Sequence, residues 1–169
     1  MKAALITQPP RIMTNVGFPN GLDTTVEKVE ADIRKHFESV YDRYLVVERK
    51  ADGVALGECK LHPPDEEGVA STDVKLLVKH HGHRYGTETK QGLLDWLFTH
   101  TDCRAVSGSP NVANVASIRM QEAVGGVRVD ETTYEFPEGM KIETTPVHLY
   151  LYHVTRETWE TREPFRAGT

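Results

Sequence analysis

The chain is 169 residues long, which suits a single domain, and 38% of its residues are hydrophobic, enough to form a core at this length. It carries 20 Lys and Arg against 25 Asp and Glu, and the formal net charge of -5 argues against a protein that chiefly neutralises nucleic-acid phosphates. The two cysteines lack the spacing of a disulfide framework, and no apolar run approaches the roughly 20 residues of a membrane helix, so we expect a cytoplasmic protein that binds neither nucleic acid nor membrane.

The first predicted element is an amphipathic helix that follows a weakly patterned segment, residues 1–22. Thr24 with Glu27 three residues later matches a capping box. Apolar residues then recur at three- and four-residue steps as far as Val40. The sequence therefore predicts a helix that begins after Thr24 and ends near Tyr41.

Three antiparallel strands are predicted next. Residues 44–48 form the first strand, and the Asp52-Gly53 pair favours a hairpin turn into the second strand, residues 54–61. A polar, proline-containing loop separates these from a third strand over residues 69–78, in which alternate apolar side chains share one face.

The second half of the chain alternates helices and strands. We predict a helix over residues 85–101, a short strand over residues 104–107, and a helix that ends at Val124, with Asn114 as its N-cap and Gly125 just past its end.

Two strands, residues 127–130 and 147–154, complete the pattern. An antiparallel meander followed by strand–helix crossovers predicts an α/β fold with a mixed central sheet and helices on both faces. We expect one domain over residues 1–169, with a disordered tail over residues 160–169.

The turn before the second long helix carries the clearest chemical signal. The first amides of a helix have no intrahelical acceptor and lie at the positive end of its dipole, and glycine lets a bulky anion approach. His83 and Arg84 add hydrogen-bonding and cationic groups, and an acidic net charge does not exclude such a local basic site. The alternative is an ordinary strand-to-helix turn. We predict that this turn holds a pyrophosphate through Gly82, His83, Arg84, Tyr85, Gly86 and Thr87.

This turn resembles the cofactor motif of the GNAT superfamily, Gln/Arg-x-x-Gly-x-Gly/Ala. His81, Arg84 and Gly86 stand at its three defined positions. The run Tyr85-Gly86-Thr87-Glu88 is similar to the Tyr-Ala-Thr-Glu of the branch that contains the ribosomal-protein N-terminal acetyltransferases. Arg84 departs from the motif because it replaces a glycine, and a guanidinium can itself bind phosphate.

Two further segments resemble the same branch. Its Asn-x-x-Ser-x-x-x-x-Glu-Lys-x-Gly-Phe motif matches in register at Asn114, Ser117, Glu122 and Gly125. Residues 151–159 resemble its last strand and Thr-Arg-Glu-x-Trp tail. Members of this branch usually begin with a strand that this chain lacks. We therefore expect the sheet edge to be either unpaired or covered by a partner chain, for example in a homodimer.

The resemblance implies the GNAT acyl-CoA N-acyltransferase fold and direct transfer of an acetyl group from acetyl-CoA, as co-substrate, to an amine acceptor. The strand before the turn would splay from its neighbour and hold the pantetheine arm through free backbone groups near Leu76, Leu77 and Val78. Asn114 and Ser117 would also contact the cofactor. The alternative is that Asn114 is only a helix cap and Ser117 only a residue of the first helical turn.

Proton transfer needs further groups. Glu58 or Asp73, on adjacent predicted strands, would act as the base, although each also suits a solvated strand position. Several relatives place a tyrosine acid where this chain has Gln121, so the resemblance leaves Ser117 as the preferred acid. His80 and its neighbours suggest a metal site, but no fourth ligand stands at a recognisable spacing, and we expect no metal.

Two rival functions remain open. A CoA-binding sensor without turnover fits the altered glycine and the missing tyrosine, and a structural α/β domain would bind no cofactor.

Overall fold

The computed structural model describes residues 9–20, 39–42, 44–138 and 144–162, together with Thr25, Glu27, Lys28, Glu30 and Ala31. The strands are β1 (Leu45–Arg49), β2 (Val54–His62), β3 (Val69–Leu76), β4 (Ala105–Gly108), β5 (Val127–Tyr134) and β6 (Val147–Thr155). The helices are α2 (Pro10–Thr14), the 3-10 helix η1 (Val78–His80), α4 (Tyr85–His100), α5 (Val115–Ala123) and α6 (Arg156–Thr161).

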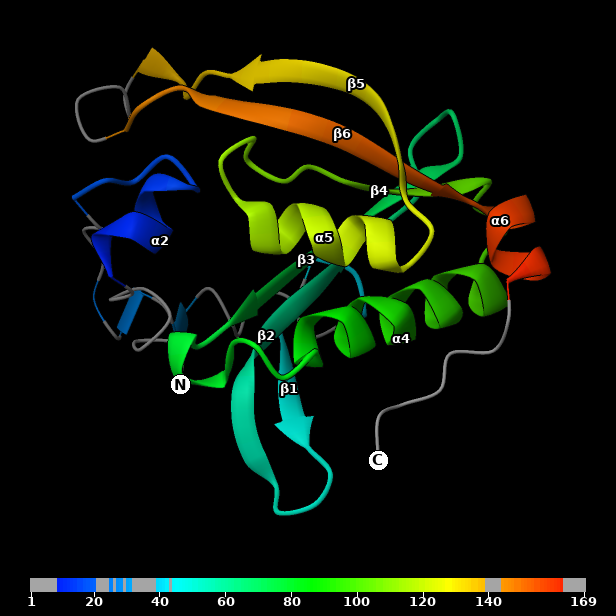
Figure 1. The fold of residues 1–169 in the computed structure, drawn as a ribbon, viewed down its shortest axis with the longest axis horizontal. Helices are drawn as coiled ribbons and strands as arrows, with labels where there is room; N and C mark the ends of the chain where they lie inside the picture. Colours follow the sequence, from blue (N-terminus) through cyan, green and yellow to red (C-terminus); the bar gives the residue numbers. More distant parts are fainter. Residues whose placement is uncertain are drawn as a thin grey trace.

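The six strands form one mixed sheet in the order β1-β2-β3-β4-β6-β5 (Figure 1). All neighbouring pairs are antiparallel except β3 and β4, which are parallel because α4 connects them across the sheet. The mixed α/β fold predicted from the sequence is therefore confirmed. β1 and β5 are the edge strands of the described sheet, and a second copy that covers either edge stays a prediction.

The core lies between the sheet and α4. Leu93, Leu94 and Leu97 place one apolar stripe of this helix on the strands. Alternate residues of the strands meet it, and the buried set comprises Cys59, Leu61, Ala70, Phe98, Cys103, Val106, Val124 and Val154. α5 lies beside α4 on the same face, so the starts of the two helices converge on one end of the sheet (Figure 1).

β3 and β4 are paired over a short distance only. Their register runs from Val69 opposite Ala105 to Ser71 opposite Ser107, after which β3 continues to Leu76 without β4. We call this divergence the fork. The strand splay implied by the resemblance is therefore present.

Several predicted boundaries differ in the structure. The third strand ends at Leu76 rather than residue 78, because Val78 begins η1. The strand predicted at residues 127–130 extends to Tyr134, since β6 pairs with it along its whole length. Residues 160 and 161, expected to belong to a disordered tail, are part of α6, and residues 163–169 lie outside the described residues.

The predicted N-terminal helix falls largely outside the described residues. Glu27, Lys28, Glu30 and Ala31 are helical. The hydroxyl of Thr25 accepts the N–H of Lys28 at 3.3 Å, while Thr24 lies outside the described residues. Within the described part of the chain, no helix is both long and apolar enough to cross a membrane.

The Thr-Arg-Glu-x-Trp tail fastens the C-terminal segment to α4. Thr155 caps α6 by accepting the N–H of Thr158 at 3.1 Å, and Trp159 Nε1 donates to Asp95 on α4 at 2.7 Å. The guanidinium of Arg156 donates to three carbonyls at and beyond the end of α4, those of Phe98 (2.8 Å), Thr101 (2.6 Å) and Cys103 (3.1 Å). These acceptors lie at the negative end of the helix dipole, which favours a cation there.

Because three carbonyls share one planar guanidinium, Arg156→Lys should not preserve all three hydrogen bonds. We expect this variant to lower the free energy of unfolding by about 2 kcal/mol, since hydrogen bonds from charged groups are lost and an ammonium cannot reach all three acceptors. Urea titration followed by circular dichroism measures the change. Arg119→Lys, at an exposed position on α5, is the control, and equal stabilities of the two variants would contradict the prediction.

Candidate functional site

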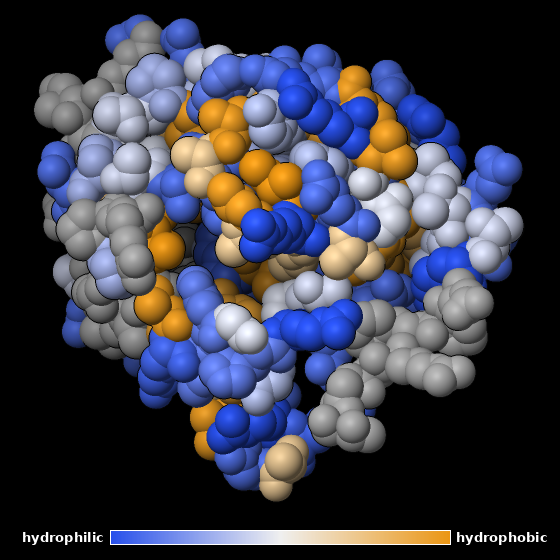
Figure 2. Space-filling view, viewed as in Figure 1, coloured by the Kyte–Doolittle hydropathy of each residue, from blue (hydrophilic) through white to orange (hydrophobic). Residues whose placement is uncertain are grey.

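A cavity of about 220 Å³ lies where the starts of α4 and α5 converge on the end of β3. Figure 2 shows this face of the molecule hollowed, with hydrophobic surface around the opening. The lining residues are Val74, Leu76, His80, His81, Gly82, Arg84, Tyr85, Gly86, Thr87, Asn114, Ala116, Ser117 and Met120.

The start of α4 presents unpaired backbone donors to this cavity. Among the described residues no side chain caps the helix, and its first internal hydrogen bond runs from the Glu88 N–H to the Arg84 carbonyl at 3.0 Å. The amides of Tyr85, Gly86 and Thr87 therefore have no intrahelical acceptor. Three convergent N–H groups at the positive end of a helix of 16 residues form a site for an anion.

Arg84 adopts the left-handed conformation at the N-cap, with φ of 62°. A glycine reaches this conformation without steric cost, whereas other L-residues are disfavoured there by about 1–2 kcal/mol. The backbone at residue 84 therefore has a conformation that suits the glycine of the motif. The Arg84 side chain is exposed at the cavity wall, where it adds a positive charge.

Gly86 leaves room in the cavity. A Cβ atom built on it would lie 3.3 Å from Met120 Sδ and 3.8 Å from Leu76 Cδ1. A larger side chain would therefore fill the space between α4, α5 and β3. The absence of a side chain at Gly86 is what keeps the amides accessible from the apolar part of the cavity.

The histidines of the turn have different roles. His81 Nε2 contacts the Leu76 carbonyl at 3.1 Å, and His83 Nδ1 contacts the His81 carbonyl at 2.8 Å, so both rings brace the turn. Within the described residues there is no group of three side chains placed to hold a metal ion.

His80 is different because its Nε2 is buried at the cavity wall and makes no hydrogen bond with the described part of the chain. Loss of hydration, reinforced by the charges of Lys79 and Arg49, lowers the pKa of His80 and favours its neutral form. A buried ring nitrogen without a partner is costly in a folded protein. A ligand amide or hydroxyl in the cavity would satisfy it.

α5 brings the downstream motif to the same cavity. Asn114 is its N-cap, and Asn114 Oδ1 accepts the N–H of Ser117 at 3.2 Å. Both residues line the cavity.

Most of the residues predicted to bind the cofactor meet at this cavity, but three do not. His83 braces the turn, Val78 belongs to η1, and the Leu77 N–H donates to the Leu56 carbonyl at 2.9 Å. The expectation that Leu77 offers a free amide to the pantetheine arm is therefore wrong. Sequence reasoning also missed His80, Val74, Ala116 and Met120, whose roles depend on non-local packing.

The backbone groups of β3 that face away from β2, beyond the pairing with β4, lie earlier on the strand. Leu77 points its N–H toward β2, and strand residues alternate in direction, so the N–H and C=O of Val74 point toward the open side of the fork. Val74 lines the cavity. The fork and the cavity therefore meet at the backbone of Val74.

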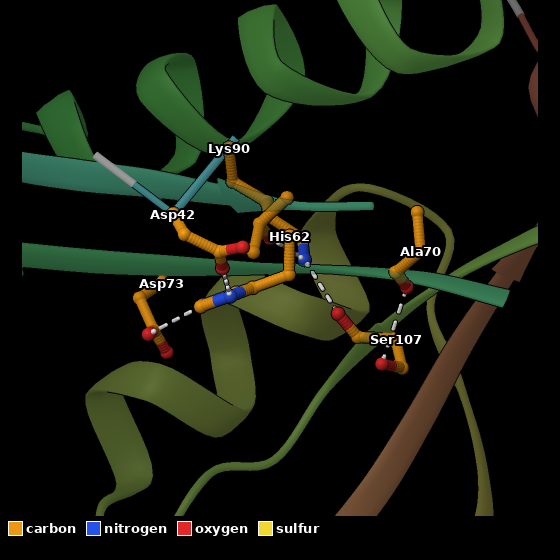
Figure 3. Close-up of polar contacts among 7 residues, drawn as sticks. Asp42, His62, Ala70, Asp73, Lys90 and Ser107 are labelled. Carbon is orange, nitrogen blue, oxygen red and sulfur yellow. Dashed lines mark hydrogen bonds and ion pairs between the residues drawn. The ribbon is translucent and has the colours of Figure 1, made fainter. Parts of the chain in front are cut away.

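The two predicted bases lie on the opposite face of β2 and β3 from α4. Glu58 is buried, with 4% of its surface exposed, whereas Asp73 is exposed. The hydrogen bond from His62 holds the pKa of Asp73 below its ordinary value. His62 also contacts Asp42, from the segment before β1, at 2.5 Å, and Figure 3 shows its ring between the two carboxylates.

This arrangement predicts a pH-dependent contribution to stability. The hydrogen bond to Asp73, and next the one to Asp42, raises the pKa of His62 above 6.5. The stabilisation from protonated His62 is therefore fully present below pH 6.5 and is lost as the pH rises through the raised pKa of His62. In acid it is lost as the pH falls through the lowered pKa of Asp73.

His62→Gln should lower the free energy of unfolding by about 0.5–1 kcal/mol in mildly acidic solution and by less in alkaline solution, because these carboxylates are partly exposed. Urea titrations at both pH values measure the difference. His100→Gln is the control, since His100 contacts a backbone carbonyl instead. A penalty for His62→Gln that is independent of pH would refute the proposed charge pairing.

The comparisons with known proteins agree with this geometry. The family model described as acetyltransferase (GNAT) domain matches residues 2–127, which is more than half of the chain. The chain therefore belongs to the GNAT acetyltransferase family. A search among curated proteins finds no matching sequence.

Solved structures show the same fold. A GNAT-family acetyltransferase from Bacillus anthracis has a TM-score of 0.72 and 19% identity, over 91% of this chain and 87% of that chain. The spermidine N-acetyltransferase from Vibrio cholerae, in complex with CoA and spermine, has a TM-score of 0.75 and 17% identity, over 95% of this chain and 91% of that chain. Identities this low establish the likeness of the fold alone.

Proposed function

We propose that this protein is an acetyl-CoA-dependent N-acetyltransferase that transfers the acetyl group directly to an amine. One observation carries the proposal: the uncapped amides of Tyr85, Gly86 and Thr87 open into an apolar cavity that continues to the fork. This combination suits an anionic diphosphate joined to a long, weakly polar arm.

The cavity offers partners for the diphosphate, the pantetheine arm and the acyl group of acetyl-CoA. The helix amides and the exposed Arg84 would bind the diphosphate. Leu76 and Met120 form an apolar wall for the pantetheine arm, and His80 Nε2 offers that arm a hydrogen-bonding atom. When bound, the co-substrate supplies an activated thioester. The Val74 N–H would then donate to the acyl carbonyl oxygen, where negative charge develops.

The proton-transfer roles rest on position. Ser117 lines the cavity in which the thiolate would leave and is the proposed acid. Glu58 and Asp73 share the other face of β2 and β3 and are the proposed bases. The lowered pKa makes Asp73 a weaker base than an ordinary aspartate, because a carboxylate already paired with an imidazole accepts a proton less readily.

The acceptor is proposed to be a cationic amine. The chain has a net charge of -5. On the sheet face opposite α4, His62 joins Asp42 and Asp73, and Glu58 of β2 lies on the same face. Polyamines belong in the first panel, since one structural neighbour is a spermidine N-acetyltransferase. Peptides with free N-termini belong there too, because the sequence motifs resemble the branch that acetylates protein N-terminal amines.

Binding is tested by thermal unfolding with acetyl-CoA. A ligand at about 100 times its Kd should add about 2.7 kcal/mol to stability. Gly86→Val should abolish this stabilisation because the new side chain fills the cavity beside Met120. Gly92→Val is a matched control, since a Cβ at Gly92 of the same helix meets no atom within 4 Å. Equal stabilisation of both variants would refute binding at this cavity.

A non-catalytic CoA-binding sensor is the second candidate. It is favoured by Gln121, which is buried with its side chain against Gly108 and supplies no hydroxyl acid. Thiol release from acetyl-CoA in the presence of the amine panel separates the candidates. Stabilisation by CoA without amine-dependent thiol release would support the sensor.

The role of Ser117 can be tested once an acceptor is found. Ser117→Ala should lower kcat by about 100-fold with little change in KM for acetyl-CoA, because general acid catalysis is lost while the cavity is kept. Ser117→Thr retains a hydroxyl and should recover much of the rate. If Ser117→Ala turned over like the wild type at every pH, Ser117 would not be the acid.

A further inference from the structure

Lys90 is a buried lysine that none of the proposed roles uses. It lies on α4 with none of its surface exposed. Its ammonium donates to the hydroxyl of Thr72 on β3 at 2.6 Å and to the carbonyl of Ser107 on β4 at 3.4 Å. Figure 3 shows the side chain reaching from the helix to the strands.

These two partners lie at the fork. Ser107 belongs to the last paired position of β4, and Thr72 is the first residue of β3 beyond that pairing. The ammonium therefore joins the two strands at the point where they separate. Val74, the next residue of β3 whose backbone points toward the open side, follows Thr72 by two positions on the same face.

Lys90 is also next to the cavity in sequence and in space. It follows Gly86 by four residues and Thr87 by three, so it lies one helical turn beyond the cavity wall. On the strand side, Thr72 precedes Val74, a residue of the cavity lining. Lys90 thus stands behind the inner end of the cavity, between the helix and the fork.

A lysine at this position costs stability. It continues the stripe of Leu93, Leu94 and Leu97, where an apolar side chain would suit the core. The contacting groups on β3 and β4 are neutral, and Asp73, on the other face of β3, is the charged group that acts on the ammonium. Burial lowers the pKa of Lys90 to about 8. Replacing buried charges by apolar groups of similar volume is often stabilising.

We propose that Lys90 is a positioning residue for acyl transfer, which fixes the width of the fork and places one buried positive charge beneath the acyl carbonyl. This inference rests on the proposed function. The ammonium holds Thr72 and Ser107 at a set separation, and this separation determines where the Val74 N–H points. The charge favours negative charge that develops on the carbonyl oxygen, in a region with little water to screen it.

The role depends on the protonated side chain. Because the pKa of Lys90 is lowered to about 8, the ammonium form predominates at neutral pH and is lost as the pH rises through that value. Recognition of the acyl carbonyl should weaken over the same range. The Val74 amide does not titrate there, and the pKa values of His80 at the cavity wall and of Asp73 behind β3 are both lowered, away from this range, so we assign the pH dependence to Lys90.

The test compares two ligands by calorimetry on the full chain: acetyl-CoA and S-ethyl-CoA, a thioether that lacks the carbonyl and does not titrate near pH 8. We expect the wild type to prefer acetyl-CoA by about 10-fold or more at neutral pH, the range of a charge-assisted hydrogen bond. Lys90→Met should reduce this preference to below about 3-fold, leave the affinity for S-ethyl-CoA unchanged and raise the melting temperature.

Gln91→Met is the matched control, because Gln91 is buried on the same helix but donates to Asp95, away from the fork. It should keep the wild-type preference. Thr72→Val provides a second variant that removes one acceptor with little change of shape, and it should reduce the preference in the same direction. In the wild type the preference should fall as the pH rises through about 8, and in Lys90→Met it should not depend on pH.

The outcomes separate this inference from the proposed function. If the wild type bound neither ligand, the proposed function would fail and the role of Lys90 with it. If the wild type bound both ligands and Lys90→Met kept the wild-type preference, the role of Lys90 alone would be overturned. A lower melting temperature with an unchanged preference would identify Lys90 as a structural link between the strands.

Discussion

The early separation of β3 from β4 is the constraint on which the rest of this site depends. Two parallel strands that stayed paired would satisfy each other's backbone groups and leave no gap between them. Here the pairing ends at Ser71 and Ser107, and β3 continues to Leu76 paired with β2 but not with β4. The Val74 backbone is thereby turned toward an open space, while α4 and α5 wall that space from one face of the sheet.

The turn before α4 shows how a motif can change while its geometry is kept. The backbone conformation at residue 84 leaves the first amides of α4 directed into the cavity, and Arg84 occupies it despite the steric cost. In return, a guanidinium stands where an anion would bind. His81 and His83 secure the same turn through backbone carbonyls, so the turn has support that does not depend on a glycine at its start.

Local rules explain what could be predicted from the sequence. The order of the six strands with α4 and α5, and the Asn114 cap, follow from periodicity, glycines and capping residues, and all depend on a few neighbouring residues. The end of β3 was misplaced because Leu77 and Val78 continue the apolar pattern, although Val78 already begins η1. The pairing of the Leu77 amide with Leu56, twenty-one positions earlier, is a non-local contact that local rules do not reveal. Lys90 was missed for the same reason: in sequence it is one more charged residue of a helix, and its burial follows from where two distant strands diverge.

The fork also relates the two faces of the sheet. Strand alternation puts Thr72 and Val74 on the face of α4, with Lys90 and the cavity, and puts Asp73 and Glu58 on the other. A thioester held in the cavity and an amine deprotonated by either carboxylate would therefore approach from opposite faces. If the strands were paired throughout, their backbone hydrogen bonds would keep the thioester and the amine apart. The two reactants would therefore meet where β3 and β4 have separated. A residue that sets the width of that opening then acts on both reactants, which is why the position of Lys90 matters beyond its own hydrogen bonds.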